Sequence, residues 1–278
     1  MTSPTVCVTV DFDGHAIWLQ WDPTLSPAKM GRADFAGTVG LPRMLDLFAA
    51  EDVPATIYVP GHTVEVFPEV CRRALAEGHE IGHHGYLHKD HTSLDIEAER
   101  REFVRGLDAY DRILGLRPRG FRAPGGDLSA NSIPLALEHG LSYDASGTAH
   151  DYLPYYARVG DAWIPDGPLA LGDLVDVVEI PLLGSMIDVP QMEFLVRPPM
   201  PGLHAYDKIL KMWCDELDWM CEFQPDGVLS LVLHPTTIPR GARLRVLRDF
   251  LRHAKAKGAR FLRHGEVADT FRATHPLS

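Results

Sequence analysis

Short apolar runs alternate with longer amphipathic segments along most of this chain. The apolar runs, several rich in β-branched residues, predict strands over residues 6–10, 55–60, 79–83, 120–123, 141–145, 175–180, 228–234 and 259–263. Apolar residues that recur at spacings of three and four predict helices over residues 41–51, 65–77, 95–114, 131–139, 204–223, 241–257 and 265–273. Because strands alternate with helices, the chain is expected to form parallel βαβ units.

Two proline-containing stretches, residues 146–174 and 181–203, fit neither pattern. Long loops in a compact domain are usually functional or interfacial, so these are expected either to shape a substrate pocket or to pack against a neighbouring subunit of a homo-oligomer. The chain has 278 residues, of which 45% are hydrophobic. This is enough to bury one large core, and we expect residues 1–278 to form a single α/β domain.

The candidate chemistry lies where predicted strands end. Asp11 and Asp13 follow the first strand two residues apart, so their side chains point the same way. His84 and His88 follow the third predicted strand and would share a face if the chain turned helical there. Aspartate and histidine bind zinc-type cations, and a catalytic site uses three protein ligands and leaves a position for water. His91 lies on the same stripe, so the three histidines form a competing ligand set.

Two further polar residues end predicted strands. Arg122 closes the short run that begins at Gly120, and His234 closes the strongly apolar run that begins at Val228. All the candidate chemistry therefore lies at the C-terminal ends of strands, which is where barrel enzymes build their active sites.

Four segments together resemble the motifs of a known family: Val-Asp-Phe-Asp-Gly-His at 10–15, Gly-His-His-Gly-Tyr-Leu-His at 82–88, and the runs 120–126 and 228–235. In content and order they are similar to the polysaccharide deacetylase family, the NodB-homology group also called carbohydrate esterase family four. The resemblance extends from Val8 to about His264 and implies a distorted (β/α) barrel of seven to eight parallel strands. It also implies these roles: Asp13, His84 and His88 as metal ligands, Asp11 as the catalytic base, Arg122 as the residue that holds this base, and His234 as the catalytic acid.

Two departures from the family pattern bear on the substrate. Phe12 separates aspartates that are usually adjacent, and Gly85 stands where Ser or Thr usually follows the first metal histidine. Both departures resemble an intracellular branch that includes allantoinase-like and cyclic-imide-hydrolysing enzymes, some of which work without metal. Because His88 is retained, the resemblance favours a metal-dependent form. The expected cofactor is a divalent ion, Zn²⁺ first, with Co²⁺, Ni²⁺ or Fe²⁺ as alternatives.

Three functions follow as hypotheses. The first is a metal-dependent hydrolase of non-peptide carbon–nitrogen bonds, an N-deacetylase that acts on a small amide or an acylated amino sugar. The second is a cyclic amide or imide hydrolase that works either with or without a metal. The third is a catalytically silent binding protein. For each of them His15, Trp18, Tyr86 and Asp151 are weaker candidates for lining the pocket.

Charge and cysteine usage narrow the partners and the location. The net charge of −11 disfavours binding to nucleic acid or to an anionic membrane surface, both of which need basic patches. No apolar stretch approaches the roughly 20 residues of a membrane span, and no leader pattern precedes the first strand. Cys214 and Cys221 lie seven residues apart on one predicted helix, about 10 Å by helical rise, which is beyond disulfide reach. We therefore expect a cytoplasmic protein.

Overall fold

The computed structural model describes residues 3–21, 24–195 and 199–277. Its centre is a curled sheet in the order β12-β1-β2-β3-β4-β5-β9-β6, and β13 pairs with the start of β1. All of these pairings are parallel except that of β6 with β9. The curled, mostly parallel sheet forms a half-barrel, which confirms the predicted fold class. The strands are β1 (Thr5–Asp11), β2 (Ala55–Val59), β3 (Glu80–His83), β4 (Gly120–Phe121), β5 (Tyr143–Asp144), β6 (Tyr155–Val159), β9 (Asp173–Glu179), β12 (Val228–Leu233) and β13 (Arg260–Phe261).

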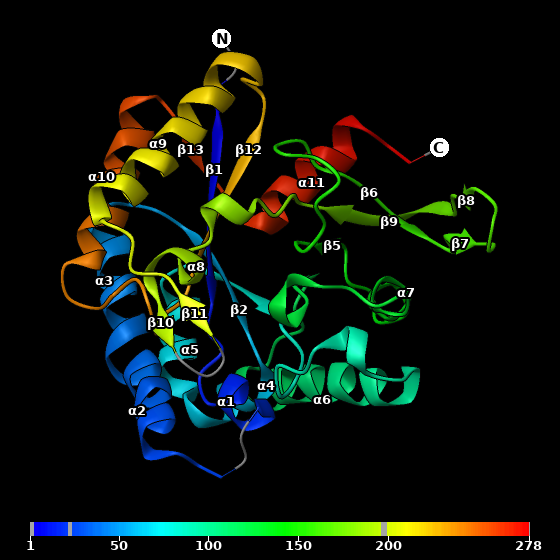
Figure 1. The fold of residues 1–278 in the computed structure, drawn as a ribbon, viewed down its shortest axis with the longest axis horizontal. Coiled ribbons are helices and arrows are strands. Elements are labelled where there is room, and N and C mark those ends of the chain that lie inside the picture. Colours follow the sequence, from blue (N-terminus) through cyan, green and yellow to red (C-terminus); the bar gives the residue numbers. More distant parts are fainter. Residues whose placement is uncertain (1–2, 22–23, 196–198, 278) are drawn as a thin grey trace.

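Helices cover the outer side of the sheet, and Figure 1 shows α3, α9 and α10 lying together along one side of it. The helices that match the sequence pattern are α3 (Leu41–Ala50), α6 (Ile96–Leu114), α7 (Ser132–Glu138), α9 (Tyr206–Phe223), α10 (Arg243–Ala256) and α11 (His264–Thr274). In α9 the predicted core-facing stripe buries Ile209, Trp213, Leu217 and Met220. None of the helices in the described part of the chain has the length and apolar character needed to span a membrane.

The expectation of one helix over 65–77 is wrong, because two helices occupy this region. These are α4 (Gly61–Val66) and α5 (Pro68–Ala76). Between them Phe67 has φ −124° and ψ 53°, outside the helical region, because a following proline disfavours helical backbone in the residue before it. The pattern also does not predict α1 (Ala16–Trp21), α2 (Pro27–Phe35), or the π-helical turn Ala36–Gly40 that joins α2 to α3.

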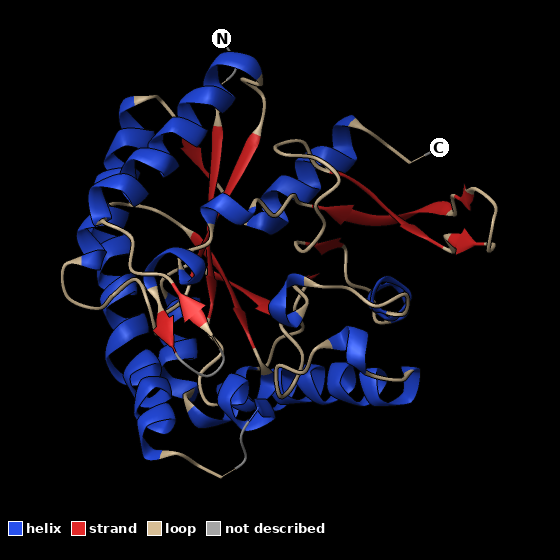
Figure 2. Cartoon of the chain, viewed as in Figure 1, coloured by secondary structure: helices blue, strands red, loops and turns tan. Residues whose placement is uncertain are grey.

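Residues 146–174 are not the loop that the sequence suggests. They contain β6 and the start of β9, and between these strands β7 (Ala162–Trp163) pairs with β8 (Leu169–Ala170). A register shift between Tyr156 and Arg158 interrupts the pairing of β6 with β9, which blurs the alternating pattern of a strand. Figure 2 shows this antiparallel ribbon extending away from the rest of the molecule.

Residues 181–203 also contain short elements. They are the 3₁₀ turn η4 (Gly184–Met186), α8 (Val189–Met192) and the strand pair β10 (Phe194–Leu195) and β11 (Met200–Pro201). The segment is tied to the sheet where Ile187 forms a parallel bridge with Val232 of β12. This bridge holds the middle of the segment beside the C-terminal end of β12.

Candidate active site

Asp13, His84 and His88 meet at the C-terminal end of the sheet. Each is buried and offers one ligand atom, and these atoms lie within 4.8 Å of one another. Asp13 Oδ1 is 3.4 Å from His84 Nε2 and 3.5 Å from His88 Nε2. Within the described ranges this is the one group of His, Cys, Asp and Glu side chains arranged to hold an ion.

Orphaned polar atoms show that this donor set fits a metal ion. Asp13 Oδ1 and His84 Nε2 are buried, and neither has a hydrogen-bond partner among the described residues. Buried polar atoms are normally satisfied, so two that face one centre indicate a ligand there. One carboxylate oxygen and two imidazole nitrogens are the donors that a catalytic zinc-type ion uses.

The protonation states are those that metal ligands need. Burial lowers the pKa of His88 to about 4, so its imidazole is neutral at pH 7. Burial alone would raise the pKa of Asp13, but the neighbouring His88 and His84 outweigh it and lower that pKa to about 2. A neutral imidazole and an ionised carboxylate bind a metal without first releasing a proton.

Local backbone geometry, rather than a helix, brings His84 and His88 together. Gly85 has φ 70° and His88 has φ 56°, so the chain after β3 makes a tight turn and not the helix that would also give His84 and His88 a shared face. The left-handed φ suits glycine at position 85, whereas His88 adopts the same region with a side chain. His84 Nδ1 donates to the carbonyl of Arg122 at 2.7 Å, which leaves Nε2 aimed at Asp13.

The competing set of three histidines does not form. His91 is fully buried in the 3₁₀ turn η2 (His91–Ser93), and its Nδ1 lies 3.3 Å from Oε1 of Glu99. His83 points into the core, where its Nε2 contacts the carbonyl of Phe103 at 2.9 Å. Burial lowers the pKa of His83 to about 3, so it is a neutral core residue.

Asp11 and Arg122 form a buried ion pair beside this centre. Arg122 Nη1 donates to Asp11 Oδ1 at 2.7 Å and to Thr9 Oγ1 at 2.9 Å, and Nε donates to the carbonyl of Ala145 at 3.0 Å. The guanidinium also lies 4.3 Å from the centroid of the Tyr58 ring. With only 2% of Arg122 exposed, these contacts hold the Asp11 carboxylate in one orientation.

His234 faces both aspartates from the end of β12. Its Nε2 lies 3.9 Å from Asp11 Oδ2 and 4.0 Å from Asp13 Oδ2. On the other side of the ring, Nδ1 lies 2.7 Å from Oδ1 of the fully buried Asp188, whose Oδ2 accepts from the backbone N–H of His234 at 2.8 Å. Burial lowers the pKa of His234, but the charge of Asp188 and its hydrogen bond outweigh burial and raise that pKa to about 9.

Asp188 is the site residue that sequence reasoning misses. It follows the bridge at Ile187, and its own N–H donates to the carbonyl of Val232 at 3.1 Å. In the sequence it is one acidic residue in a proline-containing stretch, and no spacing marks it. Only the bridge to β12 reveals its partnership with His234.

The cavity over this centre is small, about 70 Å³. Asp13 and His234 line it, with Trp18 and Trp21 of α1 on one side and residues of the 181–203 segment on the other. Glu193 of that segment pairs with Arg32 at 2.9 Å and with Arg243 at 2.6 Å. The 181–203 segment therefore shapes the pocket, which is one of the two roles expected for it. None of the described residues that line the pocket comes from 146–174.

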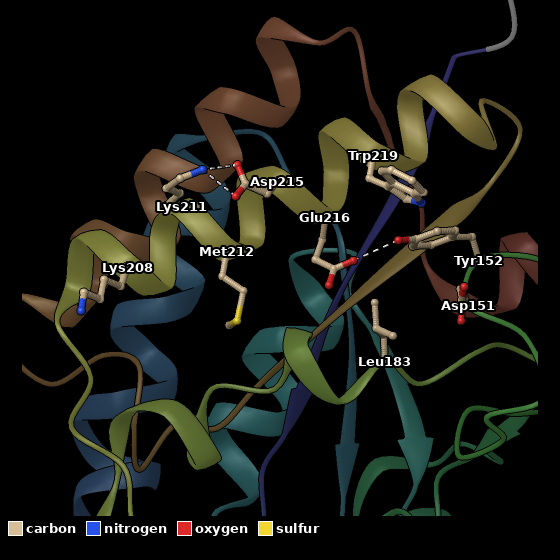
Figure 3. A pocket seen from close by; sticks show the side chains of 9 residues that line it. All are labelled: Asp151, Tyr152, Leu183, Lys208, Lys211, Met212, Asp215, Glu216 and Trp219. Atoms are coloured by element: carbon tan, nitrogen blue, oxygen red, sulfur yellow. Dashed lines mark hydrogen bonds and ion pairs between the residues drawn. The ribbon is translucent and has the colours of Figure 1, made fainter.

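Of the four weaker candidates, only Trp18 lines this cavity. His15 Nε2 contacts Asp34 at 3.0 Å, and the Tyr86 hydroxyl donates to Glu65 at 3.0 Å. Asp151 lies elsewhere, at an open hollow of about 670 Å³ beside Tyr152 and α9, with Trp219 near its rim (Figure 3). His15, Tyr86 and Asp151 are therefore not among the described residues that line the cavity over this centre.

Comparison with known proteins agrees with this geometry. A family model described as polysaccharide deacetylase matches residues 12–143. A peptidoglycan deacetylase of Helicobacter pylori is 34% identical over 284 residues, covering 98% of this chain and 97% of that protein. A crystal structure described as a polysaccharide deacetylase from Mycobacterium smegmatis is 28% identical in sequence and has a TM-score of 0.87. The match covers 98% of this chain and 91% of that chain. An allantoinase structure shares the fold, with a TM-score of 0.81, 24% identity, and coverage of 100% and 93%.

These features define a hydrolase that acts on carbon–nitrogen bonds other than peptide bonds. The chain belongs to the polysaccharide deacetylase family.

Proposed function

We propose that the chain is a metal-dependent N-deacetylase that acts on a small N-acylated amine, with a short acylated amino sugar as its preferred substrate class. The observation that carries the proposal is the placement of two supported proton-transfer groups around one metal-type centre. Asp11 is held by Arg122 and His234 by Asp188, while Asp13, His84 and His88 converge between them.

Asp13, His84 and His88 would hold the ion, which supplies Lewis-acid polarisation of the amide carbonyl and of a water molecule. Asp11 accepts the proton of the attacking water, and Arg122 keeps its carboxylate aimed at the centre. His234 is protonated at neutral pH because its pKa is raised to about 9, so it has a proton for the departing nitrogen. The nitrogen needs that proton because an amide anion is a very poor leaving group.

The size of the cavity supports a small acyl group as the part that enters. A cavity of about 70 Å³ is well below the roughly 300–1,000 Å³ of typical ligand pockets, so only a few heavy atoms fit beside the centre. The Helicobacter pylori relative is named a peptidoglycan deacetylase, which supports an N-acetylated amino sugar as the source of that acyl group. The expected cytoplasmic location stays a prediction, and it would favour soluble fragments over an assembled polymer.

The test combines metal analysis with a substrate panel. Chelator-treated protein should lose activity and regain it with Zn²⁺, Co²⁺, Ni²⁺ or Fe²⁺, and acetate release should be faster from short N-acetylated amino sugars than from intact peptidoglycan or cyclic imides. Asp13→Ala should lose the metal and turnover together, Asp11→Asn should keep the metal and lose turnover, and His91→Ala should keep the metal. Full activity of metal-free protein would refute the metal-dependent mechanism. Faster hydrolysis of a cyclic imide, or of intact peptidoglycan, would refute the proposed substrate.

A further inference from the structure

The ribbon formed by β6 and β9 ends in a hairpin that lies outside the body of the molecule. This arm hairpin, residues 160–172, contains the two-residue strands β7 and β8 and the turn between them (Figures 1 and 2). Isolated two-stranded hairpins are marginally stable in water, and neither β7 nor β8 has a buried residue. Such a hairpin needs a surface to pack against.

The side chains of the arm hairpin indicate an apolar surface as its partner. Trp163 is 69% exposed, Ile164 67%, Leu169 54% and Leu171 67%. Scattered exposed apolar residues are normal, but a group of them within nine positions of one projecting hairpin marks an interaction site. The arm hairpin is absent from the described lining of the catalytic cavity, so substrate binding there does not account for it.

The same molecule carries a hollow suited to receive this hairpin. We call it the base pocket: about 680 Å³, between the base of the ribbon, α11 and the N-terminal ends of β1, β12 and β13. Its lining is mainly apolar and includes Leu153, Tyr156, Leu262, Val267 and Phe271. The base pocket therefore lies beside the root of the arm and at the opposite end of the strands from the catalytic centre.

Charge makes the arm hairpin and the base pocket complementary. Arg260 lines the pocket, whereas the turn of the hairpin carries Asp166. The lining also includes Arg158, which pairs with Asp161 of its own chain at 3.7 Å, and the acidic Asp226. Arg260 donates to Thr5 Oγ1 at 3.2 Å and has no carboxylate within ion-pair distance in the described part of the chain. An apolar tip that carries Asp166 and an apolar hollow that carries Arg260 therefore match each other in two copies of this chain.

We propose that the arm hairpin of one copy occupies the base pocket of a second copy, and that the second copy does the same in return. A two-fold dimer is the simplest assembly in which the same two surfaces meet twice, because the contact is self-complementary. This proposal is independent of the proposed function, since neither surface belongs to the catalytic cavity. It also favours the second alternative expected for residues 146–174, packing against a neighbouring subunit.

The first test measures molar mass by sedimentation equilibrium over micromolar concentrations. The wild-type chain should have twice the monomer mass of 30.9 kDa. The double variant Trp163→Ser, Leu171→Ser should raise the dimer dissociation constant by about 30-fold or more, the effect of removing an interface hot spot. The matched control is Trp219→Ser, which changes a 55% exposed tryptophan on α9 and should leave the dimer intact. Circular dichroism checks that each variant is folded.

The second test separates the two partners of the contact. Arg260→Glu should weaken the dimer from the pocket side, and adding Asp166→Arg to it should restore the dimer. A mixture of the Trp163 double variant with Arg260→Glu should form more dimer than either variant alone, because one intact hairpin then meets one intact pocket. A wild-type monomer at 100 μM, or a Trp163 double variant that stays dimeric, would overturn the proposal. Dissociation of the Trp219→Ser control alone would place the interface on α9 and overturn it as well.

Discussion

Replacing Asp188 by asparagine tests whether His234 acts as a proton donor. The Asp188 carboxylate contacts His234 Nδ1 at 2.7 Å and also accepts from its backbone N–H at 2.8 Å. Asparagine keeps the size and one oxygen but removes the negative charge, which is the main influence that raises the pKa of His234 above its ordinary value of 6.5.

The magnitude follows from that pKa. A pKa of about 9 against 6.5 corresponds to about 3 kcal/mol of preference for the protonated ring. Without the charge of Asp188, burial opposes protonation, so the pKa of His234 should fall to 6.5 or below. At pH 7 a pKa of 6.5 would leave about a quarter of the His234 rings protonated, and a pKa near 5 about one in a hundred, so turnover at pH 7 should drop by roughly 4- to 100-fold, less than the roughly 10²–10⁴ that a positioned acid contributes in full.

The assay is kcat/KM between pH 5 and 10 on protein of known metal content. The wild-type profile should fall on its alkaline side near pH 9, and the Asp188→Asn profile should fall two or more pH units lower. Asp218→Asn is the matched control, since Asp218 contacts His253 Nε2 at 2.7 Å near the surface, away from the catalytic cavity. If Asp188→Asn lowers activity equally at every pH and leaves the alkaline fall near pH 9, then Asp188 supports the fold and does not tune His234.

Two further predictions concern stability. Arg122→Met should cost about 3–5 kcal/mol of the free energy of unfolding in urea, because it leaves Asp11 buried without its partner. As a control, Arg119→Met breaks an exposed pair with Asp269 and should cost under about 1 kcal/mol. Equal losses in the two variants would contradict this reasoning. His264 is fully buried, and burial followed by the charge of Arg122 lowers its pKa well below 6.5. Below pH 6.5 the unfolded chain therefore binds a proton that the folded chain does not, so stability is complete above pH 6.5 and falls below it by about 1.4 kcal/mol per pH unit for this group. Unfolding free energies from pH 7.5 to 5 should show a shallower slope in His264→Gln than in wild type or in the exposed His204→Gln, and an unchanged slope would refute the assignment.

The sheet and most of the centre could be predicted because they depend on local patterns. Apolar runs that end in Asp11, His84, Arg122 and His234 are strands, and the C-terminal ends of parallel strands meet at one edge of a sheet. The pattern of strands predicts that these residues lie near one another, although it does not predict the tight turn between His84 and His88. A helix would place His84 and His88 on one face, but left-handed backbone at Gly85 and His88 brings the two rings together instead.

What could not be predicted depends on contacts between distant segments. Asp188 matters because its segment bridges to β12, and a lone aspartate in sequence carries no sign of this. The predicted strand over 175–180 corresponds to β9, but its partner β6 is not predicted, because a register shift interrupts β6 and only one of its five residues, Ala157, is buried. Asp151 is predicted only as a weaker candidate for the pocket lining, and it lies at the hollow beside α9, a position that no local pattern indicates.

The order of the strands has a consequence for how the protein is made. All three metal-ligand candidates are synthesised by residue 88, but β1 lies between β2 and β12, and its start also pairs with β13 near residue 260. During translation β1 therefore waits for more than 200 residues before its pairing partners are complete, and pairings so far apart in sequence form slowly. A nascent chain contains the three ligand candidates early, yet it lacks His234, which lines the cavity, and Asp188, which contacts His234. The candidate site is thus complete only once the last third of the chain has been made, and a chain that ends before residue 188 lacks the pair formed by Asp188 and His234.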